Sequence, residues 1–439
     1  ADGPWLQWHY DVVTVPAARG SIVDRDGRIL AGNRTSLQVA VQPPLDDATL
    51  QRLSELAGTP RGRILARTLV CGQQGAEPGT CYRGEPGEPV PVLTDLAIPR
   101  ALAIRDADLP GVIVQQAAVR DYPSQANAAQ LLGYLSDGQG RSGLEAQYDQ
   151  ALRGTPGQAR RTLNREGGSA TDEVEPALEG QTLVTTLDVD TQVVAERALR
   201  EAVATARDAG YRATGGSVVV MDVRTGAIRA LASYPTYDPN IWTRGLTDAQ
   251  FDSLTDEKGG RPLVFRPTQA LMPPASTFKP LTTVAAEEAG FPLDGTYDCP
   301  SSVVVGGQVF RNYESRAYGP VSLARALSVS CDTVFYRLGY KMWKRDGALA
   351  GEGAQEHVVR TARGFGLGSA TGVDLPGEAA GSVPDRAQVL AEYDQRRGQV
   401  EAAERQYDVA RNSAEQQYQA LMGARARVTV AQKALADTV

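Results

Sequence analysis

The first part of the chain, to about residue 180, alternates short apolar and polar runs that are separated by Gly and Pro. Such a pattern is typical of short β-strands joined by turns. In residues 21–31, two apolar runs flank Asp26-Gly27, a dipeptide that favours a tight hairpin turn. We expect a short helix between Pro123 and Gly133, and a loop or linker over the polar stretch 163–179.

A second structural unit is predicted from about Gln181 onward. Residues 182–187 alternate as a strand, and residues 188–206 have the apolar periodicity of a helix. The apolar run 217–222 predicts a buried strand, and a turn at its end leads into residues 227–232. These two runs are expected to form a hairpin in a central sheet.

The pattern changes abruptly after Pro384, where proline disappears and Ala, Gln, Glu and Arg dominate. Mostly apolar residues recur at every seventh position: Tyr393, Val400, Tyr407, Ala414, Leu421, Val428 and Leu435. A second row, three residues after four of these, consists of Ala403, Ala410, Ala424 and Ala431, and is interrupted by Arg396 and Gln417. This heptad pattern predicts a long helix in a coiled coil, with alanines that permit close helix approach. A single solvated helix is the alternative.

Composition narrows the possible functions. A chain of 439 residues is expected to hold two or more domains. Its net charge of −7, with no basic stretch interleaved with aromatics, gives no indication of nucleic-acid binding. No run of eighteen apolar residues predicts a membrane span, and residues 1–5 do not resemble a signal peptide.

The few cysteines and histidines limit the chemistry further. Of the 4 cysteines, Cys71 and Cys81 flank a short loop and could close it as a disulfide, which would suit an oxidising compartment. Two unpaired thiols in a surface loop are the alternative. Because the chain has only 2 histidines, a Ser-His-Asp triad and a His-rich metal site are disfavoured, and no cofactor is expected. A serine nucleophile would therefore use another base.

The tetrad Ser276-Thr277-Phe278-Lys279 offers such a pair. Residues three apart on a helix share a face, so Lys279 is expected to lie beneath Ser276. Pro280 fits only where a helix has just begun, which places Ser276 at a helix N-terminus, where free N–H groups can stabilise an oxyanion. Lys279 is then the candidate base for Ser276. The alternative is an ordinary N-cap serine with a lysine that extends to solvent.

A second candidate motif is Ser330-Cys331-Asp332, which follows an amphipathic helical run over residues 321–327. Ser330 could relay a proton between Lys279 and a leaving group. Asp332 could orient Lys279 or hold a substrate amide. The alternative is a plain loop between two helices with a new N-cap.

At these residues the chain resembles the class B penicillin-binding proteins, the peptidoglycan D,D-transpeptidases, and most of all the penicillin-binding protein 2 type. The similarity extends in order along residues 1–385. Further matching segments are residues 19–27, 120–123, 132–134, 142–145, 234–240, 365–368 and 371–378. In this comparison the glycines of 364–368 belong to a turn and not to a phosphate loop.

The resemblance implies an α+β multidomain fold. Residues 1–180 would form a β-rich pedestal or dimerisation domain, residues 181–385 the N-terminal portion of a penicillin-binding, serine β-lactamase-like transpeptidase domain, and residues 386–439 a coiled-coil helix. Ser276 would attack the D-Ala-D-Ala carbonyl of a peptidoglycan stem peptide, with Lys279, Ser330 and Asp332 completing the site, and β-lactams would acylate Ser276.

The resemblance also implies a cellular setting. Such proteins take part in cell wall synthesis, cell shape and elongation, in a complex with a glycosyltransferase. They lie on the periplasmic side and are normally anchored in the cytoplasmic membrane by an N-terminal helix, which is absent from this chain. A coiled-coil partner for residues 386–439 is a further expectation.

Three departures from the family pattern qualify this prediction. Ala275 stands where the family usually has Gly, and Asp332 replaces the commoner Asn. No Lys-Thr-Gly or Lys-Ser-Gly occurs after Ser330, although the family uses this motif on the strand that lines the site. The pattern ends near Asp385, and the tail resembles the coiled-coil hairpin of periplasmic adaptor proteins.

Three functions therefore remain open: a transpeptidase, a carboxypeptidase or β-lactam-hydrolysing enzyme of the same fold, and a catalytically inactive scaffold or fusion chain that acts through its tail.

Overall fold

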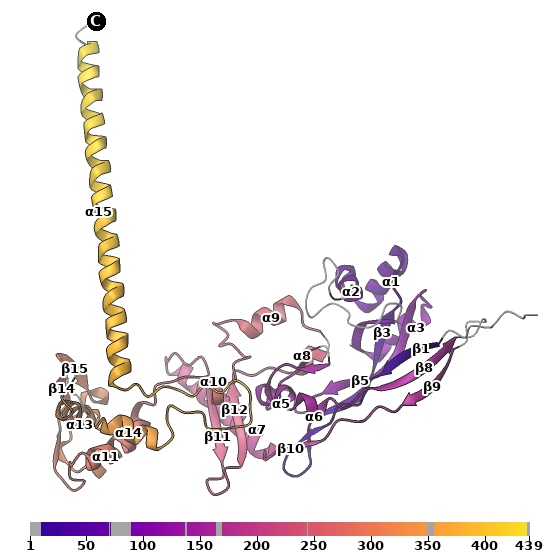
Figure 1. Ribbon diagram of the computed structural model, residues 1–439, viewed down its shortest axis with the longest axis horizontal. Coiled ribbons are helices and arrows are strands. Elements are labelled where there is room, and N and C mark those ends of the chain that lie inside the picture. Colours follow the sequence, from indigo (N-terminus) through magenta and orange to yellow (C-terminus); the bar gives the residue numbers. More distant parts are fainter. Residues whose placement is uncertain are drawn as a thin grey trace, which may run out of the picture. The chain divides into compact units, whose positions relative to one another are not determined.

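The computed structural model in Figure 1 describes residues 10–69, 71, 89–136, 138–163, 169–243, 245–348 and 355–436. Contacts divide the chain into two compact units. Unit 1 comprises Ala1–Leu271 with Gly372–Ala379, and unit 2 comprises Met272–Thr371 with Ala380–Val439. Both helices and strands occur in each unit, which confirms the predicted α+β class.

Unit 1 contains a five-stranded sheet with the order β10-β2-β3-β4, in which β5 also pairs with β3. Its strands are β2 (Ile22–Val23), β3 (Ile29–Val41), β4 (Val90–Leu96), β5 (Val112–Asp121) and β10 (Leu183–Val184). Strands β2 and β3 pair antiparallel across Asp26-Gly27, so the predicted hairpin is confirmed. Gly27 has a φ of 82°, a conformation that glycine adopts without strain.

Three helices pack against this sheet through apolar side chains. They are α1 (Asp47–Ala57), α2 (Arg61–Thr68) and α3 (Ile98–Asp106). Leu53 of α1, Ile64 of α2 and Ile104 of α3 are almost fully buried, together with Val39 and Val92 of the sheet. Helix α1 is well capped, because the Asp46 side chain accepts from the N–H of Thr49 at 2.8 Å.

A second, three-stranded sheet has the order β1-β8-β9 and consists of β1 (Tyr10–Val15), β8 (Gly157–Leu163) and β9 (Ser169–Glu175). The expectation of a loop over residues 163–179 is wrong for β9. Antiparallel backbone pairing of residues 158–163 with 169–175 creates this strand. Its polar sequence does not alternate with apolar residues, so local periodicity could not indicate it.

A buried ion-pair cluster joins three distant segments of unit 1. Glu145 lies on α5 (Gly143–Gln147), and its side chain is 0% exposed. Its two carboxylate oxygens accept hydrogen bonds from Arg19 Nε at 2.7 Å and from Arg120 Nε at 2.6 Å. Arg120 also donates to the carbonyl of Gly20 at 2.9 Å. A Cβ at Gly20 would lie 1.9 Å from the Gln181 carbonyl oxygen, so only glycine fits there.

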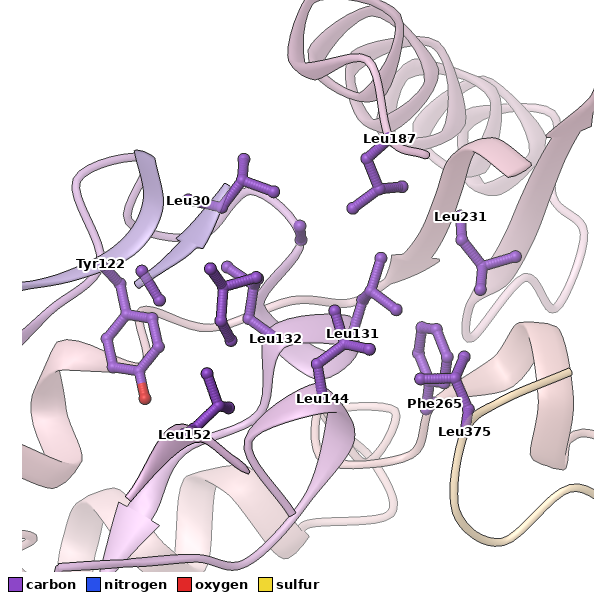
Figure 2. Packing of buried hydrophobic residues seen from close by; sticks show 13 residues of the cluster. Leu30, Tyr122, Leu131, Leu132, Leu144, Leu152, Leu187, Leu231, Phe265 and Leu375 are labelled. Carbon is purple, nitrogen blue, oxygen red and sulfur yellow. The ribbon is translucent and has the colours of Figure 1, made fainter. Parts of the chain in front are cut away.

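Beside this cluster lies the main apolar core of unit 1 (Figure 2). Leu131 and Leu132 of the short helix α4 (Ala129–Leu132) lie in its middle, which confirms the predicted helix before Gly133. Leu375, from the segment that returns to unit 1, packs beside Phe265. Tyr122 is almost fully buried here, and this burial raises the pKa of its hydroxyl well above the usual value.

The remaining part of unit 1 contains a helix on a two-stranded sheet. Helix α7 (Val189–Asp208) confirms the predicted helix, and strands β11 (Gly216–Met221) and β12 (Ile228–Tyr234) confirm the predicted hairpin. Leu199 and Val203 of α7 pack against Ala230 of β12.

The prediction that β11 is buried in a central sheet is wrong, because Val219 is 53% exposed and Met221 is 51% exposed. Among the described residues, β11 pairs only with β12.

Unit 1 is completed by shorter elements. These are α6 (Asp149–Leu152), α8 (Asn240–Thr243), α9 (Asp248–Thr255), α10 (Arg266–Gln269) and the paired strands β6 (Leu135–Ser136) and β7 (Gln139–Gly140).

Unit 2 packs its helices around a separate apolar cluster. Helix η1 (Ala275–Phe278) leads into α11 (Lys279–Glu288), and α12 (Leu323–Ser328), α13 (Asp332–Arg345) and α14 (His357–Gly364) follow. Two small strand pairs lie between them, β13 (Tyr297–Cys299) with β16 (Gly319–Val321) and β14 (Ser302–Val305) with β15 (Gln308–Arg311), and a short turn η2 (Tyr313–Ser315) follows β15. Ala285, Ala286, Leu323, Leu338 and Met342 are among the buried residues of this cluster.

A disulfide joins Cys299 at the end of β13 to Cys331, just before α13. The sequence analysis did not predict this bond. The pairing predicted for Cys71 involves Cys81, which lies outside the described residues.

The predicted long C-terminal helix is confirmed as α15 (Arg386–Ala436). It begins where the Asp385 side chain accepts from the N–H of Gln388 at 2.9 Å. Within the described ranges, no helix combines the length and apolarity that a membrane span requires.

The Glu145 cluster generates a stability prediction. We expect Glu145→Gln to lower the free energy of unfolding by about 3–5 kcal/mol, because it removes the negative partner of two buried arginines. The matched control is Glu55→Gln on α1, whose exposed ion pair with Arg52 should be worth about 0.2–1 kcal/mol. Urea unfolding of both variants measures the difference, and equal losses would contradict the assigned role of Glu145.

Candidate active site

Ser276 and Lys279 lie where a 3₁₀ turn passes into an α-helix. Ser276 is the second residue of η1, Lys279 is the first residue of α11, and Pro280 follows in the first turn of α11. The position before Ser276 is unusual, because Ala275 has a φ of 50° in the left-handed region. Ser276 is exposed, whereas Lys279 is buried.

The second motif occupies the connection between α12 and α13. Helix α12 ends at Ser328, and the N–H of Cys331 donates back to the carbonyl of Ala326 at 2.8 Å. Ser330 has a φ of 52°, again in the left-handed region, and Asp332 is the first residue of α13. This tight reversal brings Ser330 and Asp332 to the same side of the connection.

All four predicted site residues meet at the amine of Lys279. Its Nζ atom lies 3.1 Å from Ser276 Oγ, 2.8 Å from Ser330 Oγ and 2.5 Å from Asp332 Oδ1. It also lies 2.9 Å from the carbonyl oxygen of Ser330. The two serine hydroxyls are 3.0 Å apart, so Ser276, Lys279 and Ser330 form a closed triangle of hydrogen-bonding groups.

The site has a buried part, the Lys279 amine, and an exposed part, the two serine hydroxyls. The Lys279 side chain is 10% exposed, and its Nζ lies 5.7 Å from the ring centroid of Phe335, one turn along α13. Asp332 is 28% exposed and compensates the charge of the lysine. The hydroxyls of Ser276 and Ser330 therefore face solvent in front of a shielded amine, an arrangement in which an incoming molecule reaches the serines first.

The geometry does not fit the two alternative interpretations, an N-cap serine with a lysine that extends to solvent and a plain loop with a new N-cap. The Lys279 amine does not extend to solvent, and η1 has Pro274 as its N-cap with no side-chain cap hydrogen bond, so Ser276 is not an ordinary capping serine. The N-cap of α13 is Cys331, which also makes no side-chain cap hydrogen bond. In the described part of the chain, no group of three or more His, Cys, Asp or Glu residues is placed to hold a metal ion.

Asn312 supports this site and was missed by the sequence analysis. Its buried side-chain amide donates to the carbonyls of Pro300 and Arg316 at 2.9 and 2.7 Å, and its oxygen accepts from the N–H of Thr333 at 3.0 Å. Thr333 directly follows Asp332, so Asn312 holds the first turn of α13. The local sequence around Asn312 has no periodic or motif signal that could have indicated this role.

The disulfide also holds the connection between α12 and α13 that carries Ser330 and Asp332. Cys331 lies between the two motif residues Ser330 and Asp332, and its bond to Cys299 anchors this point to β13. The N-terminus of α13 is thus held by one covalent bond and by the Asn312 hydrogen bonds.

Comparison with family models gives two consecutive matches. Residues 14–185 match the penicillin-binding protein dimerisation domain, and residues 216–406 match the penicillin binding protein transpeptidase domain. The second match includes both motifs of the site and extends into α15.

Curated relatives agree with these matches. The peptidoglycan D,D-transpeptidase MrdA of Escherichia coli K12 is 30% identical over 404 residues, which are 85% of this chain and 59% of MrdA. Stage V sporulation protein D of Bacillus subtilis is 27% identical, over 83% of this chain and 51% of that protein. The chain thus spans less than two thirds of the length of these relatives.

Solved structures show the same fold. A penicillin-binding protein 2 of Helicobacter pylori has a TM-score of 0.64 at 24% identity, over 85% of this chain and 70% of that one. A chain from a peptidoglycan synthase complex that coordinates polymerization and crosslinking has a TM-score of 0.61 at 28% identity, over 88% of this chain and 65% of that one. With a dimerisation domain followed by a transpeptidase domain, and with relatives along most of its length, this chain belongs to the class B penicillin-binding proteins, of the penicillin-binding protein 2 type.

Proposed function

We propose that this chain forms an acyl-enzyme at Ser276, as a peptidoglycan D,D-transpeptidase that cross-links stem peptides in cell wall synthesis. The observation that carries the proposal is the triangle of Ser276 Oγ, Lys279 Nζ and Ser330 Oγ, with sides of 2.8–3.1 Å. A serine hydroxyl needs an adjacent base before it attacks a carbonyl, and groups at such distances can exchange protons directly.

The reaction has two steps at the same atom. Ser276 Oγ attacks the carbonyl carbon between the two D-Ala residues, its proton passes to Lys279 Nζ, and the C–N bond breaks with release of the terminal D-Ala. An amine of a neighbouring stem peptide then attacks the ester carbonyl, the new C–N bond forms, the C–Oγ ester bond breaks, and a proton from the attacking amine returns to Ser276 Oγ. β-Lactams enter the first step in the same way, and their ring C–N bond breaks.

Each of the other polar groups has a role in this scheme. Lys279 Nζ takes up the proton of Ser276, and Ser330 Oγ, at 2.8 Å from Nζ, relays it to the leaving nitrogen. Asp332 holds Nζ in place through the 2.5 Å contact. The first turn of η1 contributes backbone N–H groups without helical acceptors, which suit the developing oxyanion.

The relatives support this substrate class and the division of the chain. The names of the curated relatives include peptidoglycan D,D-transpeptidase, and the matched family domains favour a pedestal over residues 1–180, a transpeptidase portion over 181–385 and a separate helix over 386–439. A similar solved chain belongs to a peptidoglycan synthase complex, which supports a glycosyltransferase as partner. We place the protein on the periplasmic side, with membrane anchoring as in the penicillin-binding protein 2 type.

Acylation by a fluorescent penicillin tests the proposed nucleophile. We expect stoichiometric covalent label on this chain, detected by gel fluorescence and by the mass increase. Ser276→Ala should abolish the label, because it removes the hydroxyl that attacks the carbonyl, whereas Ser330 Oγ acts in this scheme only as a proton relay.

The matched control is Ser328→Ala, which removes an exposed serine hydroxyl at the end of α12 outside the triangle. This variant should keep the label. A folded parent chain that takes up no label, or a label that persists in Ser276→Ala, would overturn the proposed function.

The role of Asp332 gives a second test. Asp332→Asn keeps an oxygen that can accept from Lys279, so we expect its acylation rate to remain within about tenfold of the parent. Asp332→Ala removes the acceptor, and a lost hydrogen bond to a charged group, of about 1.5–3 kcal/mol, corresponds to a loss of roughly 10- to 150-fold. Stopped-flow measurement of penicillin acylation separates the two variants, and equal rates would show that the Asp332 contact does not position Lys279.

A further inference from the structure

Helix α15 carries a continuous apolar row that packs against nothing in the described structure. Tyr393, Val400, Tyr407, Leu421 and Val428 are 60, 58, 68, 66 and 56% exposed. They share one face because they recur at seven-residue intervals. Figure 1 shows α15 extending away from α13 and α14 of the same unit as an isolated helix. A face of this kind is typical of an interaction surface.

A second row decides which kind of helix fits this face. Ala403, Ala410 and Ala424 follow members of the first row by three residues, so the two rows together form the seam of a coiled coil. The first row is therefore large except at Ala414, and the second row is small except at Arg396 and Gln417, whose long side chains can extend out of the seam. This size difference makes the two possible orientations of a helix pair unequal.

In a parallel pair of identical helices, each residue of a row meets its own counterpart. Tyrosine would then meet tyrosine in one layer and alanine would meet alanine in the next, which alternates crowding with voids. In an antiparallel pair, the first row of one helix meets the second row of the other, so large side chains can face alanines in the layers that do not contain Arg396 or Gln417. Because well-packed interfaces have few voids and little overlap, the antiparallel arrangement is favoured.

The charges beside the seam point to the same arrangement. Arg397, Glu404, Arg411 and Arg425 follow the second row by one residue and flank the large row. In an antiparallel pair of identical helices this flanking row meets itself, so the acidic Glu404 lies among arginines of the partner. In a parallel pair it would meet the opposite flank, which is mainly neutral and includes Gln399, Gln406, Ser413 and Ala420. Among the described residues, neither Glu404 nor Arg411 has an ion-pair partner within its own chain.

We propose that α15 is the docking surface for a second copy of this chain, and that the two α15 helices pair in an antiparallel coiled coil. The seam runs from Tyr393 to Val428, which is longer than the three to four heptads, or about 21–28 residues, that sustain a coiled coil. The first row of each copy packs on the second row of the other, and Glu404 pairs with arginines of the partner. The proposal does not depend on the chemistry at Ser276.

Light scattering and spin-label distances on the full chain test the proposal. We expect a homodimer whose dissociation constant rises at least about 100-fold in Tyr407→Glu, because the new carboxylate would be buried unpaired in the seam. For orientation, Gln395→Cys, outside the seam and near one end of α15, is labelled with a nitroxide. The antiparallel pair predicts a label separation of roughly 30–50 Å at 1.5 Å per residue, and a parallel pair predicts below about 20 Å.

A charge reversal provides the matched comparison. Glu404→Arg leaves only arginines at the charged positions of the flanking row between residues 397 and 425, and should weaken the dimer at least about tenfold, more at low than at high salt. Glu415→Arg makes the same change outside the seam, where Glu415 accepts from Gln419 at 2.9 Å, and should leave the dissociation constant unchanged.

Three results would overturn the proposal: a chain that stays monomeric at all concentrations, a short label separation, and equal effects of the two reversals. Circular dichroism of each variant shows whether α15 itself remains helical, which separates loss of the helix from loss of the pair.

Discussion

The buried carboxylate of Glu145 is the interaction on which the rest of unit 1 depends. A charge that is withdrawn from water needs partners, and here they come from Arg19 and Arg120, far away in the sequence. Tyr122 lies beside Arg120, and its backbone exchanges two hydrogen bonds with the Asn240 side chain, both of 3.0 Å. Several family-like segments therefore meet in one network, which indicates that their similarity reflects folding and not substrate binding.

The same constraint organises unit 2 around the amine of Lys279. A protonated lysine has three donors, and four oxygens lie within 3.1 Å of its Nζ. Satisfying this amine requires α11 and the start of α13 to approach each other, so the condition that stabilises the fold also assembles the candidate site. The left-handed backbone at Ala275 and Ser330 flanks that contact, and such conformations persist only where the surroundings hold them.

The features that sequence reasoning could predict are those encoded within a few residues. The hairpin at Gly27, the helix α7 and the shared face of Ser276 and Lys279 all follow from local periodicity or turn chemistry. Strand β9 could not be predicted, since its pairing with β8 comes from tertiary contacts and not from an apolar alternation. The apolar run of β11 did indicate a strand, but its burial depends on neighbours that lie elsewhere in the chain.

Long-range polar contacts escaped prediction for the same reason. Asn312 acts through carbonyls and an N–H that only the fold brings near, and the pairing of Cys299 with Cys331 required two cysteines to meet across 32 residues.

The Cys299–Cys331 disulfide makes the candidate site sensitive to the redox state of its surroundings. Thiols stay reduced in the cytosol and pair in oxidising compartments, so a chain kept under reducing conditions would lack this tie. The turn that presents Ser330 and Asp332 is then anchored only by hydrogen bonds. Oxidation thus links the completion of the candidate site to an oxidising environment, as in the compartment that we propose for this protein.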